Sequence, residues 1–354
     1  MSTTTKIEWC DHTWSPWRGC TKVSPGCANC YAERLSKRNP AVLGKWGKGK
    51  PRVLAKDWEK PVRWNRDFAE AIQLADRCFP YRDRSQDTAH RPRVFPSMCD
   101  WLDPEVDPQW LFDFLKLVLR RTPEVRWLLL TKWPELFRER LKAARDRCTV
   151  DPMDVTDLID AWLAGDRIPL NVGIGTSIED QPRGDERIPE LLKIPARFRF
   201  LSVEPMLGPV DLGLNPSVRC PHCGEYVGGH ATGGHDICDC RIDWVIVGGE
   251  SGGAKSRPMH PDWARSLRDQ CQSAGVAFFF KQWGEWQNGS GFSDKAKTVL
   301  CDGRIVGDPK DCHIETQNNW AQLLPTMMLR VGKKAAARLL DGREWSEFPG
   351  IGEA

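Results

Sequence analysis

The sequence predicts an α/β protein built on a parallel (β/α) partial or full barrel of about six to seven strands, with a small Cys-rich metal insert. Two observations favour this class: short β-rich runs recur along the chain, and amphipathic helical patterns lie between them. Parallel strands need such crossover segments because a tight turn joins only antiparallel strands. The runs are mostly apolar on both faces, as in strands that are covered on both sides. An open doubly wound sheet fits the same pattern.

The expected strands have similar lengths and end in polar residues. They span residues 94–99, 125–131, 170–177, 198–204, 244–249 and 276–282, and a seventh, short candidate spans residues 6–9. One helix is expected around the apolar stripe from Leu111 to Leu119, and a second follows Pro134. A third begins at Pro261 and stops at Gly275, since proline favours a first turn and glycine a helix end.

The 354 residues suit one large domain with appended pieces. The expected parts are an N-terminal segment at 1–66 that belongs to the barrel, a barrel core at 67–290, an insert at 220–240 and a C-terminal extension at 291–354. No apolar run approaches the roughly 18 residues of a membrane span, and the N-terminus lacks the pattern of a signal peptide. We therefore expect a cytoplasmic protein whose 14 cysteines are thiols.

Positive charge is concentrated at the start of the chain. Residues 1–66 hold 14 Lys or Arg against 5 Asp or Glu, together with six tryptophans. Cations interleaved with flat aromatic rings suit a nucleic acid, whose phosphates attract the cations and whose bases stack on the rings. A solvated surface over buried tryptophans explains the same composition.

The strongest chemical signal is a loop of three cysteines, Cys20, Cys27 and Cys30, in a C-x6-C-x2-C pattern. Thiolates are the ligands that iron–sulfur clusters, zinc and Cu(I) prefer. Three protein ligands leave one coordination position open, whereas a closed structural site uses four. The spacing leaves three alternatives: an open reactive centre, a closed site with Cys10 as fourth ligand, or a buried loop without metal.

A second cysteine cluster predicts a zinc site. Four cysteines bracket a stretch with few apolar residues: Cys220, Cys223, Cys238 and Cys240. Such a segment cannot form a core of its own, so four thiolates on Zn²⁺ would hold it together. His235 replacing one thiolate is the alternative ligand set.

Polar residues follow each predicted strand. In parallel α/β folds the chemistry lies where strands end and loops begin, so these residues are candidates for one common pocket. The candidates are Asp100, Ser177, Glu179, Ser202, Glu204, Gly248, Gly249, Glu250 and Lys281. Ordinary exposure at strand ends is the simpler explanation for each of them.

Five stretches carry a family resemblance: residues 7–33, 200–209, 244–252, 257–261 and 279–284. They resemble a phage-type three-cysteine-motif family of phage and bacterial proteins of poorly defined function, over about residues 6–348. That family in turn resembles the radical S-adenosylmethionine (SAM) enzymes. The resemblance implies a 4Fe–4S cluster on Cys20, Cys27 and Cys30, bound SAM, a 5′-deoxyadenosyl radical and an electron donor such as flavodoxin or ferredoxin.

The resemblance also implies roles at the strand ends. Asp100 would act electrostatically, and Ser177, Glu179, Ser202 and Glu204 would bind the ribose hydroxyls or the amine. The run Gly248–Glu250 would let the backbone approach the adenine, and Lys281 would meet a phosphate or carboxylate. The sequence departs from the usual C-x3-C-x2-C spacing, and residues 97–100 stand where those enzymes have Gly-Gly-Glu.

Two functions follow from these features. The first is a SAM-dependent iron–sulfur enzyme acting on a nucleic acid or nucleotide. The second is a non-enzymatic protein with structural zinc that binds nucleic acid or a partner protein. The two differ in metal, since the first requires iron and the second about two zinc ions per chain.

Overall fold

A computed structural model describes residues 5–78, 90–148, 154–214, 241–289, 295–306 and 325–349. The chain forms two compact units. The first unit comprises Met1–Lys22, Leu35–Gly175 and Ile194–Phe198, and the second comprises Val23–Arg34, Thr176–Lys193 and Arg199–Ala354. Each unit is described by itself.

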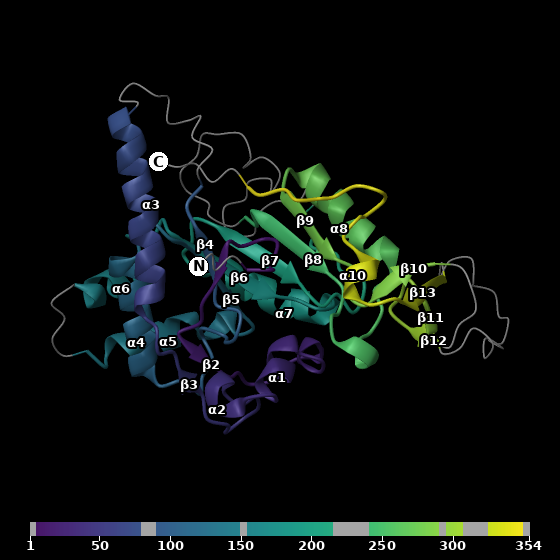
Figure 1. The fold of residues 1–354 in the computed structure, drawn as a ribbon, viewed down its shortest axis with the longest axis horizontal. Coiled ribbons are helices and arrows are strands. Elements are labelled where there is room, and N and C mark those ends of the chain that lie inside the picture. Colours follow the sequence, from purple (N-terminus) through teal and green to yellow (C-terminus); the bar gives the residue numbers. More distant parts are fainter. Residues whose placement is uncertain are drawn as a thin grey trace. The chain divides into compact units, whose positions relative to one another are not determined.

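The main sheet has seven strands in the order β1-β4-β5-β6-β7-β8-β9 (Figure 1). Its strands are β1 (His12–Thr13), β4 (Arg93–Phe95), β5 (Arg126–Thr131), β6 (Val172–Ser177), β7 (Arg199–Val203), β8 (Trp244–Gly248) and β9 (Ala277–Gln282). The neighbours pair in parallel. The order follows the chain without the reversal of a doubly wound sheet. It has two edges, β1 and β9, so the parallel partial-barrel prediction is confirmed and closure into a full barrel is not observed.

The first strand lies elsewhere than expected. Residues 6–9 form a turn, closed by a hydrogen bond from Cys10 N to the carbonyl of Ile7, and β1 follows at His12–Thr13. The reason is Asp11, whose carboxylate accepts hydrogen bonds from the backbone N–H and guanidinium of Arg93. These bonds dock the chain beside β4 only after the turn, and a two-residue strand is too short to show a periodicity.

The helices follow the apolar stripes. They are α1 (Tyr31–Ser36), α2 (Pro40–Leu43), α3 (Glu59–Cys78), α4 (Pro108–Lys116), α5 (Phe137–Arg145), α6 (Val155–Ala164), α7 (Gln181–Leu192), α8 (Pro261–Ala274) and α10 (Lys333–Ala336). Helix α8 ends at Gly275 in the left-handed conformation, as predicted, and packs against β8 and β9 (Figure 1). The tail sequence from residue 331 predicts a short helix that stops at Gly342. Helix α10 stops earlier, at Ala336, because Ala337 takes a positive φ of 57°.

The remaining strands form two smaller sheets. β2 (Trp17–Arg18) and β3 (Val53–Leu54) pair antiparallel in the first unit. In the second unit, β10 (Trp286–Asn288), β11 (Ala296–Val299), β12 (Ile305–Val306) and β13 (Thr326–Arg330) form an antiparallel sheet in the order β10-β13-β11-β12. No described helix is long and apolar enough to cross a membrane.

The C-terminal tail covers the β9 edge of the main sheet. Phe280 N donates to the Trp345 carbonyl, and the Glu347 carboxylate accepts from Phe278 N. An exposed sheet edge invites pairing with another strand, and a covering segment removes that option. The tail therefore occupies the edge that a closed barrel would use.

Tryptophans of the basic N-terminal segment contribute chiefly to the core of the first unit. Trp9, Trp14 and Trp17 are buried, and Trp14 lies within aromatic contact of Trp58, Phe114 and Trp127. Three of the six rings are therefore unavailable for stacking on bases. Trp46, Trp58 and Trp64 keep part of their surface exposed.

Candidate functional site

The cysteine loop crosses the boundary between the two units. Cys20 belongs to the first unit, and Cys27 and Cys30 belong to the second. All three are half-buried thiols. Cys27 ends a single 3-10 turn, Pro25–Cys27, and Cys30 directly precedes α1.

Two buried glutamates hold the segment that carries Cys27 and Cys30. The first is Glu179, which follows β6 and is fully buried. Its Oε1 accepts a hydrogen bond of 2.5 Å from Ser24 Oγ, which itself lies 3.6 Å from Cys27 Sγ. Arg187 neutralises the same carboxylate at 3.3 Å. Gly26 is required here, since a Cβ at that position would lie 2.5 Å from the Glu179 side chain.

The second anchor is Glu250, which follows β8. Its Oε2 accepts from Asn29 Nδ2 at 3.0 Å and from Arg257 Nε at 2.9 Å. Arg257 also donates to the Pro25 carbonyl at 3.0 Å. The segment between Ser24 and Asn29 is thus fixed at both ends to the polar termini of β6 and β8.

A third glutamate, Glu204, also stands at the end of a strand. Its partners lie outside the segment that Glu179 and Glu250 hold. It follows β7 and pairs with Lys281 on β9 at 2.9 Å, and Ser202 Oγ donates to it at 3.4 Å. The two side chains keep 13% and 15% of their surface exposed, so solvent reaches the pair. Gly248 lies beside them, and a Cβ there would lie 2.4 Å from the Glu204 carboxylate.

Two other predicted residues of the second unit, Ser177 and Gly249, make contacts through their backbone. The carbonyl of Ser177 accepts a hydrogen bond from Arg187. Gly249 packs so closely on Trp283 that a Cβ would lie 2.1 Å from its carbonyl oxygen. At Gly248 and Gly249, therefore, atoms of Glu204 and Trp283 occupy the space that a side chain would take. The predicted contact of these glycines with an adenine stays a prediction.

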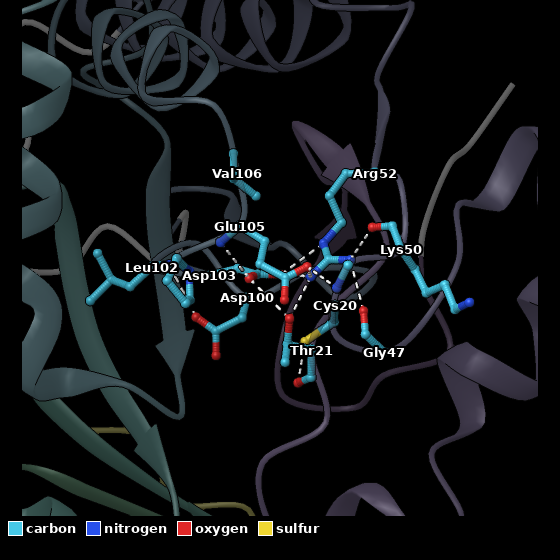
Figure 2. A network of polar contacts seen from close by, with 12 residues as sticks. Cys20, Thr21, Gly47, Lys50, Arg52, Asp100, Leu102, Asp103, Glu105 and Val106 are labelled. Carbon is cyan, nitrogen blue, oxygen red and sulfur yellow. Dashed lines mark hydrogen bonds and ion pairs between the residues drawn. The ribbon is translucent and has the colours of Figure 1, made fainter.

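In the first unit, a buried ion pair contacts Thr21, the residue that follows Cys20 (Figure 2). The Arg52 guanidinium and the Asp103 carboxylate are 2.8 Å apart, with side-chain exposures of 2% and 0%. Thr21 Oγ1 contacts both, accepting from Arg52 at 2.5 Å and donating to Asp103 at 3.3 Å. The carbonyl of Cys20 accepts from Gly47 N at 2.9 Å, so hydrogen bonds hold the chain at Cys20 and at the next residue.

The strand that the sequence predicts at 94–99 ends earlier, since β4 stops at Phe95, and Asp100 lies in the loop five residues after it. Its carboxylate accepts hydrogen bonds from Thr131 Oγ1, Lys132 N and Leu102 N. Burial nevertheless dominates and raises the pKa of Asp100 to about 7. A carboxyl group that titrates near neutral pH is able to hold or release a proton at that pH.

The ligand sets for metals remain predictions. Within the ranges that the structure describes, no group of three or more His, Cys, Asp or Glu side chains is arranged to hold a metal ion. Thiolate ligand sets commonly form as the metal binds, because the ligands must first lose their protons. The predicted zinc ligands Cys220, Cys223, Cys238 and Cys240 lie outside the described residues, as does His235.

Sequence patterns did not reveal the residues that organise these sites. Arg52, Asp103, Asn29, Arg187 and Arg257 act through contacts between segments far apart in the chain. A single sequence shows each of them only as a polar residue.

Comparisons with known proteins correct the predicted family. No curated protein matches the chain, and no solved structure matches it. The resemblance to a three-cysteine-motif family and to radical SAM enzymes was wrong, since the family found is a different one. Residues 4–349 match one family profile, so the chain belongs to the family described as "Protein of unknown function (DUF5131)".

Proposed function

We propose that the chain is an iron–sulfur enzyme that uses SAM and acts on a nucleic acid or nucleotide. The observation that carries the proposal is the clamp on the Cys27–Cys30 segment, formed by Glu179, Glu250 and Arg257. Ordinary loop packing does not require two buried carboxylates to bind one segment of six residues, Ser24–Asn29. A site that must present thiolates in a fixed geometry does call for them.

The ligand set of Cys20, Cys27 and Cys30 follows from the sequence spacing, and the structure supplies the setting of the last two. Thiolates of this kind bind iron–sulfur clusters. A 4Fe–4S cluster held by these three thiolates would supply one-electron chemistry. The chain itself orients the thiols. Hydrogen bonds from Ser24 to Glu179 and from Asn29 to Glu250 fix the loop that carries Cys27 and Cys30.

The Glu204–Lys281 pair supports an amino-acid-like cofactor. One member offers a carboxylate to an ammonium group, and the other offers an ammonium to a carboxylate. The methionyl end of SAM carries both groups. Solvent access to the pair leaves it approachable by a ligand.

The test is electron paramagnetic resonance of the anaerobically purified, reduced protein with and without SAM. We expect a cluster signal that changes when SAM is added. A colourless protein that contains about two zinc ions and no iron would reject the enzyme and favour the zinc-stabilised binding protein.

A second measurement addresses the Glu204–Lys281 pair. Lys281→Met is expected to weaken SAM binding at least about tenfold, the effect of losing one charged hydrogen bond. Lys193→Met, which removes an exposed lysine paired with Glu190, is the control and should leave binding unchanged. Equal SAM affinity in both variants, by equilibrium dialysis, would exclude a role for the pair.

A further inference from the structure

A short loop in the first unit presents three lysines to solvent. We call residues 45–50, with the sequence KWGKGK, the lysine loop. Lys45, Lys48 and Lys50 are exposed, and Trp46 between them is half-buried. None of the three ammonium groups has an ion-pair partner among the residues that the structure describes. Their charge is therefore available to an external anion.

The backbone of the lysine loop is fixed along its length. Lys45 N donates to the Pro51 carbonyl at 3.4 Å, and Lys50 N donates to the Gly47 carbonyl at 3.3 Å. Gly49 N donates to the Glu105 carboxylate at 2.7 Å. Gly47 and Gly49 have φ of 121° and 68°, values that favour glycine, so the loop conformation is encoded in its sequence.

Arg52 braces the lysine loop through hydrogen bonds to its backbone (Figure 2). Its guanidinium donates to the carbonyls of Gly47 at 3.3 Å and Lys50 at 2.5 Å. The charge of Arg52 is met by Asp103 at 2.8 Å and by Glu105 at 3.3 Å. The charge of Arg52 is thus neutralised within the protein, whereas the three lysines are exposed to solvent.

We propose that the lysine loop binds the phosphodiester backbone of a single-stranded nucleic acid. Three cations on a braced loop contact phosphates with little further ordering of the backbone, and contacts to phosphate release condensed counterions. The half-exposed ring of Trp46 adds a flat face on which a base stacks. The choice of nucleic acid rests on the proposed function, but the binding itself needs no metal.

The experiment measures fluorescence anisotropy of labelled oligo-dT and oligo-U, about 20 nucleotides long, with the full chain. The triple variant Lys45→Gln, Lys48→Gln, Lys50→Gln should bind at least about tenfold more weakly at low salt. The slope of log affinity against log salt should become shallower by about 2, since each lost phosphate contact removes about 0.7. Binding of one oligomer alone identifies DNA or RNA as the ligand. Binding of both shows that the lysine loop does not distinguish the two.

The matched control removes the same charge elsewhere, at the exposed lysines Lys255, Lys333 and Lys334. It should keep the wild-type affinity and slope. Equal losses in both triple variants would overturn the proposal, as would phosphatidylserine vesicles binding more tightly than either oligomer. Iron content separates this proposal from the enzyme: nucleic-acid binding without iron supports the lysine loop and rejects the cluster.

Discussion

At the scale of single residues, Asp100 makes the stability of the protein depend on pH. Burial raises its pKa to about 7, from 3.8 in the unfolded chain. Between pH 4 and 7 the folded protein therefore holds a proton that the unfolded chain has lost. The free energy of unfolding falls as pH rises through this window, by up to about 1.4 kcal/mol per pH unit.

Asp100→Asn should remove this dependence, as measured by urea unfolding at several pH values. Asp11→Asn is a control with the opposite sign. Burial acts to raise the pKa of Asp11, but the hydrogen bonds and charge of Arg93 outweigh it and lower that pKa to about 2. Asp11 therefore stabilises the fold above pH 4, and its contribution is lost as pH falls toward 2. An unchanged slope between pH 4 and 7 in Asp100→Asn would contradict the assignment.

The Arg52–Asp103 pair leads to a stability prediction. Arg52→Met leaves a fully buried carboxylate without its charge partner, and it should lower the free energy of unfolding by about 3–5 kcal/mol. Replacing both residues, Arg52→Met with Asp103→Leu, should recover part of this loss. Arg63→Met breaks an exposed pair with Asp57 and should cost less than about 1 kcal/mol. Urea unfolding at pH 7 compares the three variants, and equal losses for Arg52→Met and Arg63→Met would refute the prediction.

Sequence patterns identified strand-end acids but not their partners. Glu179, Glu204 and Glu250 stand directly after apolar runs, where parallel folds place polar groups. Arg52 and Asn29 lie in loops, and their partners are 51 and 221 residues away in the chain. Periodicity carries no information about contacts of that range.

At the scale of elements, the turn after β8 depends on the absence of a side chain. Gly249→Ala should destabilise the protein by more than about 2 kcal/mol, because the new Cβ would meet the backbone carbonyl of Trp283. Gly184→Ala in α7 is the control, since its Cβ meets nothing closer than 3.9 Å. Alanine favours a helix over glycine by up to about 1 kcal/mol, so this variant should be neutral or more stable. Thermal unfolding compares them, and equal melting temperatures would contradict the close approach.

The longer strands were predictable because each is a run of apolar residues that is covered on both faces. β5, β7, β8 and β9 begin and end within one residue of the sequence expectation. β1 was not predictable, since its position depends on the docking of Asp11 on Arg93. The short C-terminal helix was overestimated for a related reason: the tail ends its helix early and continues as a segment along β9.

At the scale of the whole molecule, α/β periodicity predicted the parallel partial barrel, and local spacing predicted a thiolate site. The sheet does not close at β9 because the C-terminal tail pairs with that edge. The sequence pattern of the strands did not predict this pairing. Membership of an uncharacterised family leaves the chemistry to be decided by the protein's own residues. Those residues place two of the three thiols on a segment that buried carboxylates hold at the strand ends.

The most direct measurement is iron and acid-labile sulfide per chain after anaerobic purification, for the wild type and two cysteine variants. We expect about four of each in the wild type and in Cys78→Ala, which removes an exposed thiol at the end of α3. Cys27→Ala should lose both elements while keeping the wild-type far-ultraviolet circular dichroism. Iron that persists in Cys27→Ala, or a wild-type protein with zinc alone, would contradict the iron–sulfur assignment.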